Sequence, residues 1–231
     1  MTLSKFEVLA SKKLVKNNEK TRNELLYSLN NGMLRTLIEN LVDNQEELEN
    51  VARRSYCHNN GFFKILLIDN RPSYSIRLHI WPEQPFQECD IHNHPWDMSV
   101  LILNGSYEWP IYIVENTQEA NNCCELYQCK YLKDYSGHSF LKKGNVKVIE
   151  TGRETFQRGD IIQLLSTKYH SVKKNNSSPA DSIMITSRSK VLNADVISNR
   201  EMTCKTTLYN TSVDSSILKE KLLSFLDRSY S

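Results

Sequence analysis

The sequence predicts a mainly β protein, a sandwich or barrel with helices at both ends. Two observations favour this fold class. From Gly61 onward, short runs rich in aromatic and β-branched residues alternate with turn-forming residues, which is typical of an all-β domain. Before Gly61, and again near the end of the chain, apolar residues recur at helical spacing. With 231 residues, the chain is long enough to bury a substantial core.

The first part of the chain is predicted to be helical. Between Leu25 and Leu41, leucine-rich positions recur every three or four residues. Asn44 is a candidate N-cap for a further helix through about Arg54, because its side chain can accept hydrogen bonds from first-turn amides and acidic residues follow it. Helical spacing returns in residues 215–228.

The middle of the chain is predicted to be a series of short strands. The predicted strands are residues 62–68, 74–81, 99–103, 107–114, 125–132, 147–151, 161–165 and 182–187. Asn104-Gly105 lies between two of them and predicts a hairpin, and residues 134–144 are interpreted as a loop or lid. These predictions divide the chain into an N-terminal helical segment (1–58), a β-barrel (59–190) and a C-terminal extension with an amphipathic helix (191–231).

Composition narrows the class of partner. The formal net charge is only +2, and Lys and Arg are scattered among acids, so nothing favours nucleic-acid binding. We expect a cytoplasmic protein that does not engage a membrane, because the apolar runs are too short for a signal peptide or a span. The six cysteines form no C-x-x-C pair, so reduced thiols are expected rather than disulfides or a structural zinc site.

The residues 90–105 carry the most specific functional signal. His92 and His94 are two positions apart, so in an extended strand both side chains point to one face and can bind one divalent cation. His170 is the candidate third ligand, from a distant turn. Strict alternation places Met98 on the inward side and Asp97 outward, so Asp97 would need a bulge to reach the metal.

Candidates for substrate contacts are fewer and each has a plain structural alternative. Arg77 and His79 share a strand face with Trp81, and Arg77 can clamp a carboxylate if that face is the inner one, or be solvated if it is the outer one. Tyr107 is a candidate wall residue and proton donor, or simply core. Arg188 is a further candidate for a substrate contact, or simply a surface residue, and we expect His58 and His138 not to be metal ligands.

Two half-motifs resemble those of the cupin superfamily, which are roughly G-x5-H-x-H-x3-4-E-x6-G and G-x5-P-x-G-x2-H-x3-N. His92, His94 and Gly105 match the first, and Gly159 and His170 match the second. The departures are Phe86 for Gly, Met98 for the metal-binding Glu, Leu165 for Pro, Thr167 for Gly and Lys174 for Asn. The resemblance implies a jelly-roll β-barrel, here with an N-terminal helical segment and a C-terminal helix, and often a dimer.

The missing glutamate narrows the resemblance. A three-histidine site without a carboxylate resembles the cysteine dioxygenase and thiol dioxygenase group, and His170-Ser-Val172 is similar to the His-x-Val of that group. No match to its Ser-His-Tyr segment occurs near residues 182–187, so the resemblance does not extend to cysteine as the substrate.

The function implied by the resemblance is a mononuclear non-haem iron oxygenase acting on a small polar metabolite such as an amino acid or thiol. In it, His92, His94 and His170 hold Fe(II), although three imidazoles also accept nickel, manganese, copper or zinc. Two alternatives stay open. One is a metal-independent sugar or keto-acid isomerase or epimerase that uses His79 with Tyr107 or Tyr169 as base and acid. The other is a non-catalytic cupin that binds a small ligand.

Overall fold

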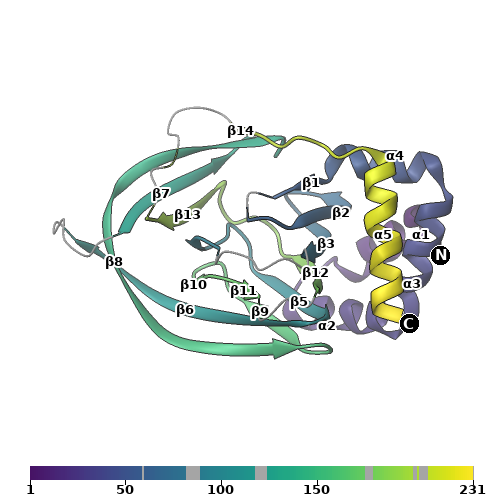
Figure 1. Ribbon diagram of the computed structural model, residues 1–231, viewed down its shortest axis with the longest axis horizontal. Helices are drawn as coiled ribbons and strands as arrows, with labels where there is room; N and C mark the ends of the chain where they lie inside the picture. The colour runs from purple at the N-terminus through teal and green to yellow at the C-terminus, as the bar shows by residue number, and fades with distance from the viewer. Residues whose placement is uncertain are drawn as a thin grey trace.

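The computed structural model describes residues 1–58, 60–81, 89–117, 124–174, 179–199, 202 and 208–230. Two antiparallel sheets face each other, and a helical layer covers one of them (Figure 1). The six-stranded sheet has the order β1-β2-β3-β12-β5-β9. The eight-stranded sheet has the order β11-β6-β10-β4-β13-β7-β8-β14, and β6 also pairs with β8. The predicted fold class, a mainly β jelly-roll barrel with helices at both ends, is confirmed by these pairings.

The six-stranded sheet contains β1 (Tyr56–Cys57), β2 (Phe63–Asn70), β3 (Tyr74–Trp81), β12 (Ala180–Thr186), β5 (Met98–Asn104) and β9 (Ile161–Leu164). The eight-stranded sheet contains β11 (Lys173–Lys174), β6 (Ser106–Thr117), β10 (Tyr169–His170), β4 (Ile91–His92), β13 (Asn193–Ser198), β7 (Cys124–Tyr131), β8 (Gly137–Gln157) and β14 (Leu208–Tyr209). The helices are α1 (Leu3–Lys13), α2 (Glu19–Ser28), α3 (Leu34–Asp43), α4 (Gln45–Arg54) and α5 (Ser215–Tyr230).

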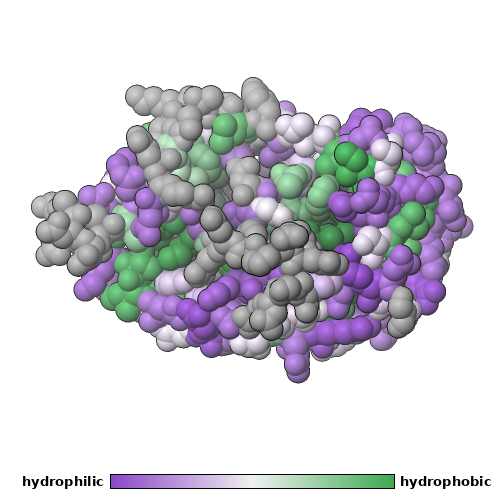
Figure 2. Space-filling view, viewed as in Figure 1, coloured by the Kyte–Doolittle hydropathy of each residue, from purple (hydrophilic) through white to green (hydrophobic). Residues whose placement is uncertain are grey.

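The helical layer is held to the six-stranded sheet by the largest apolar core of the molecule. Leu25, Leu37 and Phe225 pack with outward-facing strand residues such as Leu78 and Ile183, and all five are fully buried. The N- and C-terminal helices therefore form one layer, and both termini lie on that side (Figure 1). The surface over these helices is mostly hydrophilic (Figure 2), as expected where each helix buries only one stripe.

The predicted Asn44 cap is confirmed, since its Oδ1 accepts a hydrogen bond from the Glu47 amide at 3.1 Å. The predicted hairpin at Asn104-Gly105 is wrong. Strand β5 pairs with β12 and β9, whereas β6 pairs with β8, β10 and β11, so the chain turns a corner between the two sheets. Gly105 is still required there. It has φ +69°, and a Cβ would lie 2.4 Å from the Pro179 carbonyl oxygen.

Two further boundaries differ from the sequence predictions. The predicted loop or lid at residues 134–144 is strand from Gly137 onward, because β8 pairs with β7 along Tyr127↔Lys142 to Tyr131↔His138. Strand content also continues past residue 190, where β13 lies between β4 and β7. The division of the chain into domains otherwise stays a prediction.

Cys57 and Cys129 are free thiols. Cys123 and Cys204 lie outside the described residues. None of the helices in the described ranges is long and apolar enough to cross a membrane.

Candidate metal centre and its cavity

Three histidines from distant parts of the chain converge at one point. The ring centroids of His92 and His94 are 4.8 Å apart, and those of His170 lie 4.6 Å from His92 and 5.2 Å from His94. One ring nitrogen of each lies within 4.8 Å of the corresponding nitrogens of the others, a spacing that one ion can bridge. Among the described residues, no other group of histidine, cysteine or acidic side chains meets this condition.

Strand pairing accounts for this convergence. His170 of β10 lies directly opposite His92 of β4. His94 follows the end of β4, in a segment held by Asn93, which receives the Asp195 amide on its Oδ1 at 2.7 Å and donates its own amide to the Asp195 carbonyl. The alternation expected from H-x-H therefore survives, although the regular strand ends at His92.

The orientation of each ring is fixed by a neighbour. His92 Nδ1 lies 2.8 Å from the Asp90 carbonyl oxygen, which can only accept, so Nδ1 carries the proton and Nε2 is left with its lone pair. The His94 ring stacks on Trp96 at 5.9 Å, and the His170 ring stacks on Trp109 at 5.3 Å. Flat indole walls restrict both rings, so little side-chain freedom is left to lose when an ion binds.

Electrostatics favour neutral imidazoles at this site. Burial lowers the pKa of His94 and of His170 well below the usual histidine value, and burial also lowers the pKa of His92. Only the neutral ring can ligate a metal. Donor set, spacing and charge state therefore fit a divalent transition-metal ion held by His92, His94 and His170.

No carboxylate of the described residues joins the three histidines. Met98 is buried against the cavity, whereas Asp97 points away and accepts hydrogen bonds from the Ser166 amide at 2.8 Å and from Lys190 Nζ at 3.0 Å. These contacts confirm the predicted orientations, with Met98 inward and Asp97 outward. Asp97 therefore stabilises the turn before β10. The inward position that could carry a fourth, hard ligand is occupied by the Met98 thioether.

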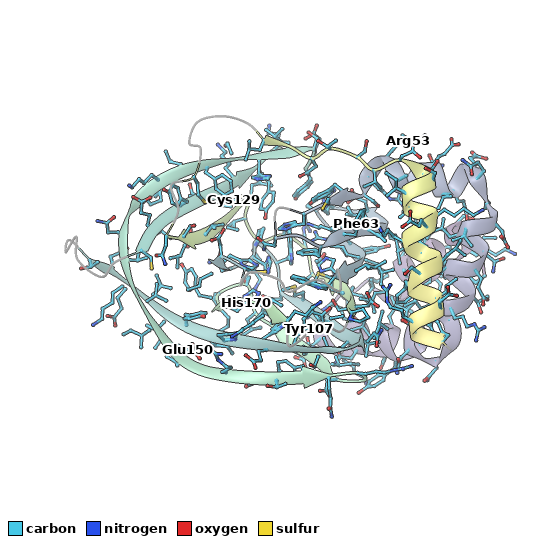
Figure 3. The ribbon with its side chains drawn as sticks, in the orientation of Figure 1. Arg53, Phe63, Tyr107, Cys129, Glu150 and His170 are labelled. Carbon is cyan, nitrogen blue, oxygen red and sulfur yellow. The ribbon has the colours of Figure 1, made fainter. Side chains whose placement is uncertain are left out.

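The histidines line a cavity of about 700 Å³ between the two sheets. Aromatic side chains make up much of its wall, among them Trp81, Trp96, Tyr107 and Tyr131. Figure 3 shows His170 and Tyr107 in this interior, whereas Glu150 lies on the outer strand β8. The cavity is large enough for a small metabolite and surrounds it with mostly apolar surface.

The cavity wall formed by the six-stranded sheet carries a buried guanidinium. Arg77 and His79 of β3 both line the cavity, which settles that their face is the inner one. The Arg77 guanidinium stacks 4.5 Å above the Trp96 ring and donates through Nε to Ser75 Oγ at 2.7 Å. Its Nη2 is buried and makes no hydrogen bond with any described residue. Burial lowers the pKa of Arg77 to about 10, so the group stays charged at neutral pH.

Arg77 lacks a carboxylate partner among the described residues. Asp69, a carboxylate whose charge acts on Arg77, is engaged by Arg71 in a two-point contact. A buried guanidinium with a free N–H is costly unless an anion satisfies it. The geometry therefore suits a ligand that brings its own carboxylate or similar anion.

All predicted site residues reach the same cavity: His92, His94, His170, Arg77, His79 and Tyr107. As predicted, His58 and His138 stand outside the histidine cluster, although they also line the cavity. Arg188 is exposed. The residue that the sequence reasoning missed is Lys64, which lines the cavity beside His79. The sequence signal for it is a lysine within the apolar run Phe62–Ile68.

No family model and no curated protein matches this chain. Among solved structures, the cupin domain of Schizosaccharomyces pombe Cnp3 aligns at 12% identity over 55% of this chain and 61% of that chain, with a TM-score of 0.34. An uncharacterised Klebsiella pneumoniae protein with a double-stranded β-helix domain aligns at 11% identity over 61% of this chain and 87% of that chain, with a TM-score of 0.36. A DMSP lyase structure aligns at 8% identity over 55% of this chain and 47% of that chain, with a TM-score of 0.34. Likenesses this low carry no conclusion about function, and the description of the fold rests on the strand pairings.

Proposed function

We propose that this chain is a metal-dependent enzyme on a cupin-type barrel, a mononuclear non-haem iron oxygenase that acts on a small anionic metabolite such as an amino acid or thiol. The observation that carries the proposal is the cluster of three neutral histidines, joined by no carboxylate of the described residues, in one cavity with a guanidinium whose Nη2 makes no hydrogen bond with any described residue. When bound, an iron(II) ion would supply the means to activate O2 towards a substrate.

The residues of the chain have separate tasks in this proposal. His92, His94 and His170 hold the ion on one side and leave its other positions open to the cavity. Arg77 binds the carboxylate of the substrate and so fixes its orientation relative to the ion. Trp81, Trp96 and Tyr107 exclude bulk water around it. We further propose that the protein works in the cytoplasm on a small molecule, without nucleic acid or membrane as a partner, and that it forms a homodimer.

The first experiment measures metal content of protein purified without a His tag, beside a His92→Ala/His94→Ala variant. We expect near-stoichiometric iron in the parent and its loss in the variant, with an unchanged far-UV circular dichroism spectrum. Oxygen uptake is then screened with small carboxylates, and Arg77→Met should lose uptake while it keeps the iron. Parent protein that stays empty after anaerobic Fe(II) addition would contradict the proposal. Iron with saturable ligand binding and no turnover would favour the binding protein instead.

A second candidate is a metal-independent isomerase or epimerase. One observation favours it: His79 Nε2 is buried in the cavity and makes no hydrogen bond with any described residue. A general base needs such a nitrogen to accept a proton from a bound substrate. Burial raises the pKa of Tyr107 well above 10, so that phenol can act only as an acid. Turnover that survives chelation and the loss of His92 and His94 would identify this candidate.

A further inference from the structure

Lys64 is a buried amine that the proposed oxygenase does not use. It is the second residue of β2, only 9% exposed, and its side chain lines the cavity. Its ammonium nitrogen lies 5.2 Å from the centre of the Tyr56 ring. It makes no hydrogen bond or ion pair with any residue in the described part of the chain. Lysines are almost never buried in this way without a partner.

The charges around Lys64 disfavour its protonated form. Arg77 and Arg71 line the same cavity as Lys64, and their positive charges act on it. The neighbouring histidines, His58 and His79, are neutral. Asp69 is engaged by Arg71. Burial, with the two guanidinium groups, lowers the pKa of Lys64 well below the usual lysine value. A buried amine beside other cations is the environment in which lysine becomes a nucleophile towards carbonyl groups.

The neighbours of Lys64 supply the two other groups that such a reaction needs. His79 lies directly opposite Lys64 in the β2–β3 pair, and its unpartnered Nε2 can relay a proton. Arg77 is two residues from His79 on the same face of β3, so its guanidinium lies diagonally from the amine. Neighbours on this diagonal are about 7–8 Å apart at the backbone, within reach of long side chains.

We propose that Lys64 forms an imine with short α-oxo acids, with Arg77 holding the carboxylate and His79 moving the proton. The Nζ atom attacks the carbonyl carbon to give a carbinolamine. His79 transfers a proton from the nitrogen to the hydroxyl, water leaves with both amine hydrogens, and a C=N bond replaces the C=O bond. No oxidant, reductant or metal takes part, so this activity stands apart from the proposed oxygenase.

The test uses the full chain with glyoxylate and cyanoborohydride at pH 7, which reduces an imine to a stable carboxymethyl amine. Peptide mapping then compares Lys64 with Lys147, an exposed lysine on β8. We expect Lys64 to be labelled at least about tenfold faster, because an ordinary lysine is almost wholly protonated at this pH. Labelling at Lys64 no faster than at Lys147 would overturn the proposal. Because mapping uses the parent protein, this outcome does not depend on any variant.

Variants refine the assignment. Lys64→Met should remove the fast phase, and the matched control Lys147→Met should leave it. Arg77→Met should slow labelling by glyoxylate but not by propanal, which has no carboxylate. If Arg77→Met slowed labelling by both aldehydes equally, or by neither, the proposed specificity for α-oxo acids would be overturned. The His92→Ala/His94→Ala variant should keep the fast phase, so failure of the metal proposal and failure of this one are distinguishable.

Discussion

On strand β3, Ile76, Leu78 and Ile80 face the helical layer, whereas Arg77, His79 and Trp81 face the cavity. Every residue of this strand is buried, so neither face meets bulk solvent. The outer face is explained by packing, because its apolar residues interlock with the helices. Packing does not explain the inner face, because that face buries the Arg77 charge without a carboxylate partner among the described residues. Charge that packing does not account for marks the inner face as the one shaped for a ligand.

We expect the largest difference in the free energy of unfolding between substitutions at two adjacent residues, Leu78 and Arg77. Leu78→Ala removes a fully buried side chain from the outer face and should lower the free energy of unfolding by about 2–5 kcal/mol. Arg77→Met removes a buried charge that no described carboxylate neutralises, and should change the free energy of unfolding by less than about 1 kcal/mol. Urea denaturation measures both, with circular dichroism as the control for the folded state. A loss of 2 kcal/mol or more in Arg77→Met (about the lower bound for Leu78→Ala) would show that its charge is part of the structure.

Local patterns predicted much of the fold and of the site. The helices, most of the longer strands and the three histidines follow from spacing, because side-chain direction along a strand or helix is set by backbone geometry. The same alternation placed Met98 inward and Asp97 outward. The sequence could not show whether Arg77 points into the barrel or outward. Alternation assigns the residues of a strand to two faces, but it does not say which face packs on the helices.

The errors share one physical cause, which is that pairing partners are chosen by the tertiary structure. Asn104-Gly105 provides a tight turn, but β5 and β6 find their partners in different sheets. The segment after Gly137 contains Gly144 and two lysines and has a weak strand pattern, yet β7 supplies a full ladder for it. Lys64 was missed because its role depends on a cross-strand neighbour, His79, that is fifteen residues away in sequence.

A buried charge on the outer face offers the next test. Asp181 of β12 is fully buried, and it accepts hydrogen bonds from Arg228 of α5 at 3.2 and 3.3 Å. Burial outweighs this partner and raises the pKa of Asp181 to about 6. Because the folded-state pKa lies above the unfolded one, the stabilising contribution is complete below about pH 4 and is lost as pH rises through about 6.

Asp181→Asn should remove that pH dependence. The free energy of unfolding of the parent minus that of the variant should fall by up to about 3 kcal/mol between pH 4 and pH 7. Urea denaturation across this range measures it, and the subtraction cancels the contribution of the histidines. Asp43→Asn, at an exposed position at the end of α3, is the matched control and should show no such fall. A difference that rises with pH would mean that Arg228 outweighs burial.

The smallest effect should come from the far end of the helical layer. Asn44 caps α4 by accepting the Glu47 amide, and Asn44→Ala should lower the free energy of unfolding by about 1 kcal/mol. Its influence on the cavity should be nil, because α4 packs on the opposite face of β2 and the histidines are held by the pairing of β4 with β10. Anaerobic metal titration of this variant should therefore match the parent. A weakened metal affinity at unchanged folded fraction would show that the two faces of the sheet are coupled, and the ligand face could then no longer be treated as independent of the packing face.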